Sequence, residues 1–478
     1  MWQPVLTVSG YILGILGLLM LIPAGFDLWQ SNAEWSPFLT SAAITIFFGL
    51  SLYLSNNTKV ERIDVKQAYL ITAFSWLLVC LFSAIPFALF GVVDNVTDAW
   101  FEAASGVTGT GATIITDIET LPQSILLWRS LLNGIGGLGV VIFAVALLPI
   151  LGIGGMQMFQ RENSDSNGKF MPKFSYIAKR IVVVYFSLIG LCCTAYILCG
   201  MHWFDAINHA ISVTGTGGFS TKNNAIAAFD SFSIELVTML FMLSGAVPMT
   251  FYILFLRGLP ADKNRQVCTF FRLIFYIGLA LSLYLYFVTD MPLFTALRNG
   301  YFTVISTMTT TGLTSANYIL WGSWITTLIL FLSFSGGCTG STSGSVKIFR
   351  WQVVYAFLRK SLLTAIDSNR IIPLKIGAMN LSEKVALSVF VYLFSFFICL
   401  ILITLVVSLC GTDFATSLAA VSACITNVGM GAVAAIGPEG NYAFFNPAIK
   451  YILTFTMFLG RLEIITVLAL FSKAFWRR

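Results

Sequence analysis

Four stretches of this sequence bring small and hydroxylic residues together with a glycine, a combination that suits the binding of a dehydrated cation. Each stretch starts as a short helical segment, which is in most cases opened by an acidic residue or preceded by a proline. Glycine adopts positive φ without steric cost, so backbone carbonyl oxygens can turn inward and replace the hydration shell of an ion. We therefore predict a cation filter from the residues that close the four stretches: Thr110-Gly111, Thr216-Gly217-Gly218, Thr310-Thr311-Gly312 and Asn427-Val428-Gly429.

The second stretch contains two adjacent glycines, so its register needs a choice. Matching the sequence Val-Thr-Gly-Thr-Gly that the first two stretches share would pair Gly111 with Gly217. Alignment from Asp98 and Asp205 without gaps instead pairs Gly111 with Gly218. This second register also places the glycine before an apolar residue and a Ser or Thr in three of the four stretches. We therefore assign Gly218 to the filter. The alternative for any one stretch is ordinary helix packing, in which small residues are common inside membranes.

The composition places these stretches in a membrane protein. The chain has 478 residues, of which 57% are hydrophobic and only 10% are charged, whereas soluble chains are about a quarter charged. Its long uncharged runs suffice for helices of ~20 residues, the length that crosses ~30 Å of hydrocarbon. We expect ten crossings, at about 5–27, 37–54, 68–93, 122–150, 177–202, 231–257, 269–289, 322–350, 384–410 and 447–472.

The glycine stretches follow the third, fifth, seventh and ninth expected crossings, always on the same side of the membrane. This order predicts an all-α polytopic membrane protein with four helix–pore-helix–helix repeats around one central pore, plus two extra N-terminal transmembrane helices. The boundaries that we predict are 1–66 for the two N-terminal helices, 67–160 for repeat 1, 161–265 for repeat 2, 266–375 for repeat 3 with a gate loop, and 376–478 for repeat 4.

The distribution of basic residues predicts the orientation. The stretches 59–66, 161–180, 257–272 and 350–384 and the C-terminal tail together hold 21 of the 27 Lys and Arg residues. Basic loops remain in the cytoplasm, so both termini are expected there. Because the basic residues follow this topological pattern, the net charge of +6 does not indicate a nucleic-acid partner.

The eighth expected crossing is interrupted by residues 335–345, which are rich in glycine, serine and threonine. Such residues form helices poorly, and their exposed backbone must face water or protein. The residues that we assign to this candidate gate loop are Gly336, Gly337, Gly340, Ser341, Gly344 and, directly after it, Lys347. The alternatives are a packing kink for the loop and a cytoplasmic interfacial position for Lys347.

Arg461 lies in the middle of the last expected crossing, where an arginine costs about 2.5–3.5 kcal/mol on insertion scales and usually faces an interior or cavity. It is either a fixed positive charge beside the pore or part of a structural salt bridge, for which Glu235 is a candidate partner. Arg129 is expected to be a structural anchor paired with Glu102. The cations that we expect to be solvated near the outer surface are Lys222, Arg298 and Lys450.

Other kinds of site find little support in the sequence. Nine cysteines without a CxxC pair indicate neither a disulfide framework nor a metal site. The run Gly134-Ile-Gly-Gly-Leu-Gly139 matches a dinucleotide-binding pattern but lies in a membrane helix with no preceding strand, so no nucleotide is expected on this chain. The two histidines, His202 and His209, are expected to have ordinary interfacial roles.

The whole chain resembles the TrkH/TrkG potassium-uptake subunits, whose superfamily also includes the Ktr and plant HKT transporters. The residues that carry the resemblance are Gly136-Gly-Leu-Gly-Val-Val, the run 148–157, Gly217-Gly-Phe-Ser-Thr221, Gly336-Gly-Cys-Thr-Gly-Ser-Thr342, Gly460-Arg-Leu-Glu463 and the terminal Phe-Trp-Arg.

The resemblance implies a fourfold pore whose filter glycines are Gly111, Gly218, Gly312 and Gly429. Because Gly111 stands where sodium-permeable relatives have serine, it also implies a preference for potassium. The segment 335–345 would be the intramembrane gate, and Arg461 a charge beside the pore. Further implications are a homodimer in the bacterial inner membrane and a cytosolic TrkA-type ring. That ring, rather than this chain, would bind NAD and ATP or ADP.

Two other functions are weighed against a potassium channel. A proton- or sodium-coupled symporter would show inverted repeats and acidic residues inside the membrane, but here all four short stretches lie on one side and only Glu102, Glu235 and Glu463 are candidate acids. An intramembrane enzyme would need a nucleophile–base pair or a metal cluster, and the sequence offers only the two histidines and no HExxH motif.

Overall fold

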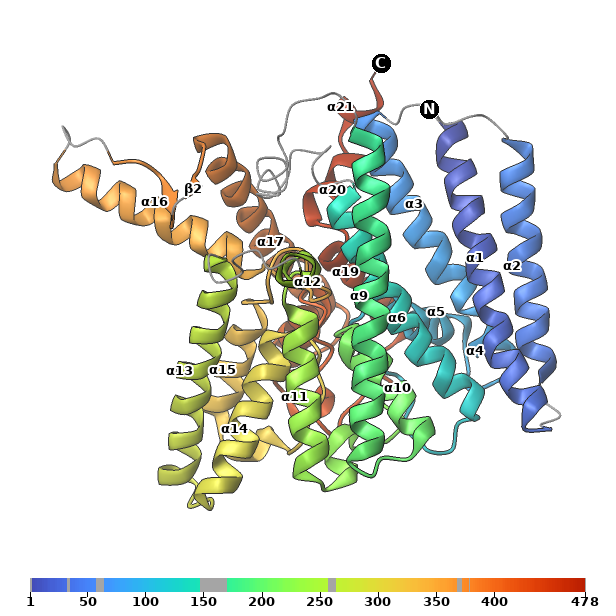
Figure 1. Cartoon of the computed structure of the whole chain (residues 1–478), viewed down its shortest axis with the longest axis horizontal. Helices are drawn as coiled ribbons and strands as arrows, with labels where there is room; N and C mark the ends of the chain where they lie inside the picture. The colour runs from blue at the N-terminus through green and yellow to red at the C-terminus, as the bar shows by residue number, and fades with distance from the viewer. Residues whose placement is uncertain are drawn as a thin grey trace.

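The computed structural model describes residues 2–31, 35–56, 64–146, 170–256, 264–367, 372–377 and 379–477, and it is almost entirely helical (Figure 1). Outside these residues lie the run 148–157 and several basic residues used to predict the orientation, namely Lys59, Arg62, Arg161, Lys169, Arg257, Lys263, Arg370 and Arg478. The long and re-entrant helices are α1 (Trp2–Trp29), α2 (Ser36–Ser55), α3 (Val65–Ser83), α4 (Ile85–Leu89), α5 (Val96–Thr108), α6 (Gln123–Ala146), α9 (Phe170–Leu198), α10 (Trp203–Thr214), α11 (Phe232–Ala246), α12 (Met249–Leu256), α13 (Arg265–Val288), α14 (Leu293–Met308), α15 (Ser323–Ser333), α16 (Ile348–Ile366), α17 (Glu383–Leu409), α18 (Phe414–Ile425), α19 (Pro447–Arg461), α20 (Ile464–Leu470) and α21 (Lys473–Trp476).

The remaining regular elements are small. Three 3₁₀ helices, η2 (Ala225–Phe229), η4 (Tyr318–Trp321) and η5 (Ala434–Ile436), follow the second, third and fourth glycine stretches. The strands β1 (Lys375–Ile376) and β2 (Met379–Asn380) pair antiparallel, with Lys375 opposite Asn380. Among the described residues these are the only strands, so the prediction of an all-α fold is confirmed.

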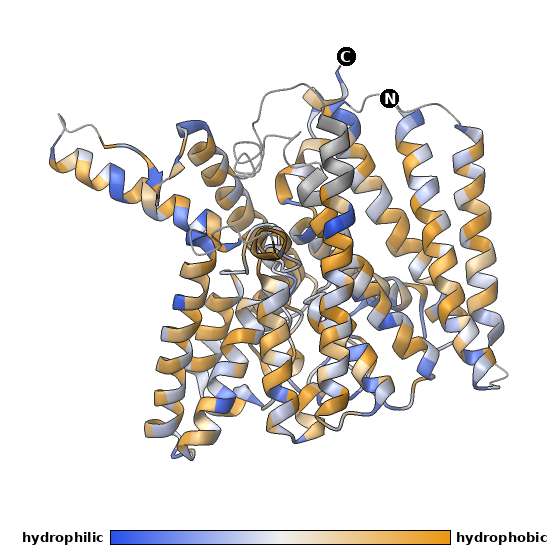
Figure 2. Cartoon of the chain, viewed as in Figure 1, coloured by the Kyte–Doolittle hydropathy of each residue, from blue (hydrophilic) through white to orange (hydrophobic). Residues whose placement is uncertain are grey.

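Within the described residues, seven helices are long and apolar enough to cross a membrane, and two bent helix pairs raise the number to nine. Figure 2 shows hydrophobic residues along most of these helices and hydrophilic residues concentrated near their ends. The polytopic character expected from the composition is therefore present. The eighth expected crossing, 322–350, corresponds to α15, a loop and the start of α16, and is not one continuous helix.

Two further expected crossings, 231–257 and 447–472, are sharply bent. The helices α11 and α12 meet at 91°, and α19 and α20 meet at 114°. The first bend follows Val247-Pro248, where proline lacks the N–H that would continue the helix. The second bend contains Glu463, whose φ of 65° is left-handed. The hydrophobicity of 231–257 and 447–472 correctly indicated membrane segments, but it carried no information on their direction.

The helices α1 and α2 lie at one edge of the bundle, outside the short helices (Figure 1). They approach each other closely at Gly10, Gly17 and Gly49, where an added Cβ would press on backbone atoms of the opposite helix. Most buried hydrophobic residues of the bundle form two large clusters. One joins mainly α1 to α6 with α17 to α20, and the other joins mainly α9 to α15.

Candidate ion pathway

The four glycines chosen from the sequence form one closed ring. Their φ angles are nearly equal, at 79° for Gly111, 82° for Gly218, 76° for Gly312 and 77° for Gly429. A Cβ added to any of these glycines would collide with the carbonyl oxygen of the residue that precedes the next ring glycine. For Gly111, Gly218, Gly312 and Gly429 in turn, that oxygen belongs to Gly217, Thr311, Val428 and Thr110. Four segments from one chain therefore converge on a single axis. The contact order also requires Gly218, not Gly217, in the second segment.

The short helices α5, α10, α14 and α18 end in the same C-terminal turn. The residue two positions before each ring glycine is left-handed, with φ of 62° at Gly109, 50° at Thr216, 58° at Thr310 and 55° at Asn427. The N–H of the residue that follows each left-handed position donates a hydrogen bond to the carbonyl oxygen five residues earlier. The N···O distances are 2.9 Å from Thr110 to Ser105, 2.9 Å from Gly217 to Ser212, 3.0 Å from Thr311 to Ser306 and 3.0 Å from Val428 to Ala423. This is the Schellman pattern, and it aims the negative end of each helix dipole at the centre.

This turn was not predicted from the sequence, because only Gly109 and Asn427 are residue types that commonly adopt positive φ. Threonine is β-branched and rarely adopts positive φ, so Thr216 and Thr310 gave no signal of a left-handed position. Such positions cost about 1–3 kcal/mol each and persist only where surrounding contacts hold them. Their recurrence at equivalent places of the ring is the observation that marks the turns as a functional feature.

A buried ion pair holds the first two ring segments from behind. Arg129 Nε lies 2.9 Å from Glu102 Oε1, and the two side chains are 1% and 0% exposed. Glu102 also accepts hydrogen bonds from Thr113 Oγ1 and the Ile114 N–H, just after Gly111. Arg129 Nη1 donates to the carbonyl of Ser220, 3.0 Å away in the second segment. The expected pairing of Arg129 with Glu102 is confirmed, and the pair connects two neighbouring repeats.

Other polar side chains hold the remaining segments. Ser306 Oγ donates to the carbonyl of Leu313 at 2.6 Å, while Tyr442 and Tyr318 donate to the carbonyls of Gly429 and Gly431 at 2.8 and 2.7 Å. These tyrosines could not be identified from the sequence. Tyr318 is 113 residues from its partner in the chain, and Tyr442 stands 13 residues after Gly429, outside the recurring glycine pattern. His209 is fully buried, and its Nε2 lies 2.9 Å from Ser220 Oγ. His209 therefore lies inside the protein beside the second ring segment, and the interfacial role expected for it stays a prediction.

The candidate gate loop lies against the ring on the side where the short helices end. The Gly344 N–H donates to Thr310 Oγ1 at 2.7 Å, and Thr216 Oγ1 donates to Thr342 Oγ1 at 3.1 Å. A Cβ on Gly344 would lie 2.7 Å from the carbonyl oxygen of Thr426. The loop thus contacts the second, third and fourth ring segments.

The same loop fills the bend between α11 and α12. The N–H groups of Cys338 and Thr342 donate to the carbonyls of Ala246 and Gly245 at 2.9 and 3.2 Å, and the Met249 N–H donates to the Gly340 carbonyl at 3.2 Å. Backbone groups freed by the broken helix are therefore satisfied by the loop, as a membrane interior requires. The bend and the loop form one structural unit.

The predicted loop residues contribute in different ways. Gly336 and Gly340 have positive φ of 67° and 85°, and a Cβ on Gly337 would overlap the side chain of Ser343. Ser341 Oγ donates to the Cys338 carbonyl at 2.6 Å. Lys347 is partly buried with a φ of 73°, and it immediately precedes α16.

Arg461 lies at the end of α19 and is 5% exposed. Its Nη1 donates to the carbonyl of Thr342 in the gate loop at 3.0 Å, and Nη2 donates to that of Gly136 at 3.2 Å. The guanidinium also lies next to Gly109, at the end of α5. Its positive charge is therefore held between the loop and the ring. The alternative salt bridge with Glu235 is wrong, because Arg298 Nε bonds that carboxylate at 2.6 Å.

Two outer cations that we expected to be solvated are in ion pairs. The ammonium of Lys450 lies 2.7 Å from Asp98 Oδ1, and the two side chains are 7% and 12% exposed. Arg298 is 22% exposed and bridges α14 to Glu235 on α11. Lys222, by contrast, is about one third exposed and has only a 3.7 Å contact with Glu119. The missed signal was the acidic residue in the first turn of α5 and of α11.

Comparison with known proteins agrees with this arrangement. A model of the TrkH family, described as cation transport protein, matches residues 36–285 and 266–478. The chain is 35% identical to the Trk system potassium uptake protein TrkI of Halomonas elongata, over 100% of this chain and 97% of that protein. It is 33% identical to the Trk system potassium uptake protein TrkG of Escherichia coli, over 98% and 97% of the two chains.

Similarity extends to a solved structure. The crystal structure of the potassium transporter TrkH from Vibrio parahaemolyticus covers 100% of both chains, with a TM-score of 0.93 and 30% sequence identity. Sequence and fold thus match proteins of one kind along the full length. The chain described here belongs to the TrkH family of cation transport proteins.

Proposed function

We propose that this protein carries potassium across the bacterial inner membrane as the membrane subunit of a Trk-type uptake system. The observation that carries the proposal is the closed ring of Gly111, Gly218, Gly312 and Gly429. Because the ring has backbone carbonyls at each contact and helix C-termini behind it, it offers partial negative charge without a carboxylate. That chemistry suits a monovalent cation that must leave again after it has lost its water. The relatives named as potassium uptake proteins support the choice of ion, and they argue against an enzyme.

The gate in this mechanism is the loop 335–345. In the closed arrangement its backbone stands beneath the ring. It is held there by the hydrogen bond from the Gly344 N–H to Thr310, by the hydrogen bond from the Thr342 hydroxyl to the Gly245 carbonyl, and by the guanidinium of Arg461. Ion passage requires that this loop move away, and its glycines allow the backbone to do so. The Arg461 charge opposes a cation in the closed pore by Coulomb repulsion, which is strong where water is scarce.

The assembly that we propose is a homodimer whose termini are cytoplasmic. A cytosolic ring of the TrkA type, with NAD and ATP or ADP as its ligands, is the proposed regulator. Potassium is the ion that we assign to this chain, and we assign no nucleotide to it. A proton- or sodium-coupled symporter stays the alternative, although the described intramembrane acids Glu102, Glu235 and Glu463 are all paired with arginines, which leaves no free carboxylate among them to carry a proton.

The test is rubidium and sodium flux into liposomes that contain the purified protein, with no proton or sodium gradient imposed. We expect potassium-driven rubidium flux in the wild type. We also expect a loss of potassium over sodium discrimination of about tenfold or more in Gly111→Ser, since the added side chain would press on the Gly217 carbonyl and a tenfold change is only about 1.4 kcal/mol.

Gly190→Ser is the matched control, because a Cβ at Gly190 meets nothing within 4 Å. Unchanged discrimination in Gly111→Ser would overturn the filter assignment. Flux that appears only when a proton or sodium gradient is present would favour the symporter.

A further inference from the structure

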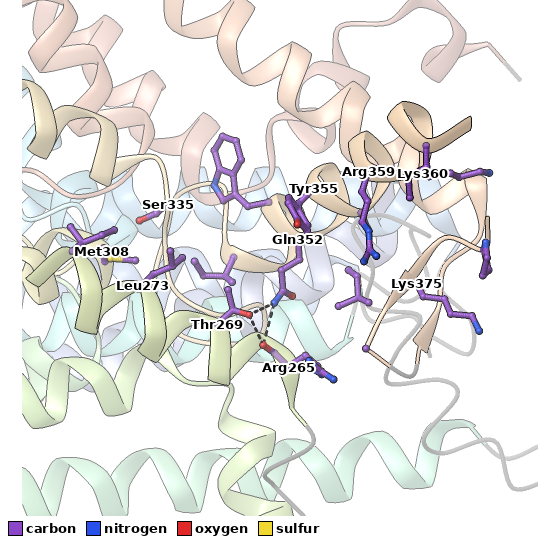
Figure 3. A pocket seen from close by; sticks show the side chains of 18 of the residues that line it. Arg265, Thr269, Leu273, Met308, Ser335, Gln352, Tyr355, Arg359, Lys360 and Lys375 are labelled. Atoms are coloured by element: carbon purple, nitrogen blue, oxygen red, sulfur yellow. Dashed lines mark hydrogen bonds between the residues drawn. The ribbon is translucent and has the colours of Figure 1, made fainter. Parts of the chain in front are cut away.

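A pocket of about 900 Å³ lies between α13, α15, α16 and the segment 372–377 (Figure 3). Its lining changes in character from one end to the other. Figure 3 shows Leu273, Met308 and Ser335 toward one end, and Arg359, Lys360 and Lys375 toward the other. The apolar end is completed by Ile277, Phe331, Leu332 and Ile348, and the basic end by Arg265. The pocket is therefore amphipathic along its length.

The basic end has an excess of positive charge. Four cations line the pocket and no acidic residue does. Lys360 pairs with Glu383 at 2.8 Å, whereas the salt bridges of the described residues include none to Arg265, Arg359 or Lys375. Three cations without a counterion among the described residues favour an anionic occupant, and a phosphate group accepts hydrogen bonds from several cations at once.

One polar atom of the pocket lacks a partner. Gln352 Nε2 donates to Thr269 Oγ1 at 2.8 Å and to the carbonyl of Arg265 at 3.2 Å. Its Oε1, however, is buried without a hydrogen-bond partner among the described residues. A buried acceptor without a donor is unfavourable, so the pocket is suited to an occupant that also carries a hydroxyl or an amine.

The position of α16 puts the pocket at the membrane surface. Leu358, Leu362 and Ile366 stand four residues apart on this helix and are 54%, 57% and 82% exposed. Figure 1 shows α16 leaving the bundle sideways, nearly across the direction of α13. An apolar stripe on such a helix is typical of a segment that lies in the headgroup layer. Trp351 and Tyr355, which also line the pocket, are residues common at that depth.

We propose that this pocket binds an anionic phospholipid with a hydroxylated headgroup, of the phosphatidylglycerol type. The phosphodiester lies among Arg265, Arg359 and Lys375, the headgroup hydroxyl donates to Gln352 Oε1, and an acyl chain follows Leu273 and Ile277. Inorganic phosphate would leave the apolar end empty. A second copy in a twofold contact would bring the same cations to the same face.

The proposed site touches both ends of the gate loop. Ser335 opens the loop and Ile348 follows it, and both line the pocket. Trp351 Nε1 donates to the carbonyl of Phe334 at 3.2 Å, which fixes α16 to the end of α15. A bound lipid would therefore contact the two hinges of the loop. The binding itself does not depend on the proposed potassium function, so the two proposals fail independently.

The experiment is native mass spectrometry of the full chain, titrated with dioleoyl phosphatidylglycerol or dioleoyl phosphatidylcholine. We expect the wild type to retain one phosphatidylglycerol per chain in preference to phosphatidylcholine. Arg359→Gln combined with Lys375→Gln is expected to weaken this binding about tenfold, the effect of losing ~1.4 kcal/mol of charge-assisted contacts. The matched control is Arg272→Gln with Lys384→Gln, which removes two exposed cations that do not line the pocket.

A second variant separates lipid from other occupants. Ile277→Trp fills the apolar end and leaves every cation in place, so it is expected to reduce phosphatidylglycerol binding as well. Binding that survives Ile277→Trp and is displaced by inorganic phosphate would make the site an anion site and overturn the proposal. Unchanged lipid binding in the double variant, together with a shift between monomer and dimer masses, would identify the pocket as a contact between copies and also overturn it.

Discussion

At the scale of single residues, the pathway depends on ion pairs that lie behind the ring rather than in it. Asp98 and Glu102 are one helical turn apart on α5 and are both paired with a cation. Only Glu102 also bonds the segment that follows Gly111. Both acids are therefore paired with a cation, but only Glu102 is also connected to the proposed filter.

This difference leads to a prediction for Glu102→Gln. The substitution leaves Arg129 buried without its charge partner, a change that costs about 3–5 kcal/mol, and it weakens the contacts of Thr113 and Ile114. We expect a lower unfolding temperature together with a lower ratio of rubidium to sodium flux. Both are measured on the purified protein, by thermal unfolding and in liposomes.

Asp98→Asn is the control, because it leaves Lys450 unpaired but touches no residue of the ring. It should lower the unfolding temperature and leave the flux ratio unchanged. An equal loss of selectivity in the two variants would mean that Glu102 acts only through general stability.

The cations also show the reach of sequence-based reasoning. The Arg129–Glu102 pair was predictable because both residues stand in apolar segments where a solitary charge is unfavourable. Lys450 and Arg298 were misassigned, because a position near a loop does not reveal whether a neighbouring helix covers it. The partner of Lys450 is 352 residues away in the chain.

At the scale of elements, the sequence predicted what the segments are but not how they bend. Hydrophobicity located the crossings, and the recurring pattern of an opening acid or proline, small and hydroxylic residues and a glycine located the four short helices and the ring glycines. The left-handed turns at Thr216 and Thr310, the 91° bend after α11 and the contact of the gate loop with that bend were not predictable. The left-handed turns and the loop contact depend on tertiary contacts, whereas Pro248 indicates a break in the helix but not the angle of the bend.

The contact between the loop and the ring gives a prediction for Thr310. Its Oγ1 accepts the Gly344 N–H, and one such bond contributes about 1 kcal/mol. Thr310→Ala should weaken the closed arrangement and raise rubidium flux about fivefold, since ~1 kcal/mol corresponds to that shift between two states.

Thr310→Ser keeps the oxygen and serves as the matched variant, for which flux close to that of the wild type is expected. If Thr310→Ala and Thr310→Ser raised flux equally, the hydrogen bond to the loop would have no part in closing the pore.

At the scale of the whole molecule, the two N-terminal helices stand apart from the pathway. They pack on each other at Gly49, where an added Cβ would lie 2.8 Å from the Gly14 nitrogen. Their place at the edge of the bundle matches the prediction of two extra helices before the repeats (Figure 1). The domain boundaries themselves stay predictions, because the helices pack across every one of them.

Gly49→Ala tests this separation. The methyl group must push α1 and α2 apart, so we expect a loss of about 1–3 kcal/mol of stability, seen as a lower unfolding temperature with an unchanged rubidium to sodium ratio. Gly14→Ala is the control, since its Cβ would meet nothing within 4 Å and alanine favours a helix. Altered ion preference in Gly49→Ala would show that α1 and α2 influence the ring.

The ring of four glycines has a consequence for how ion preference can change over time. In a pore made of identical subunits, one codon change alters every quarter of the opening at once. Here a single gene supplies four different quarters, so a mutation changes one of them and leaves three intact. Discrimination between alkali metals can therefore drift in small increments, and each quarter is free to acquire its own supporting side chains.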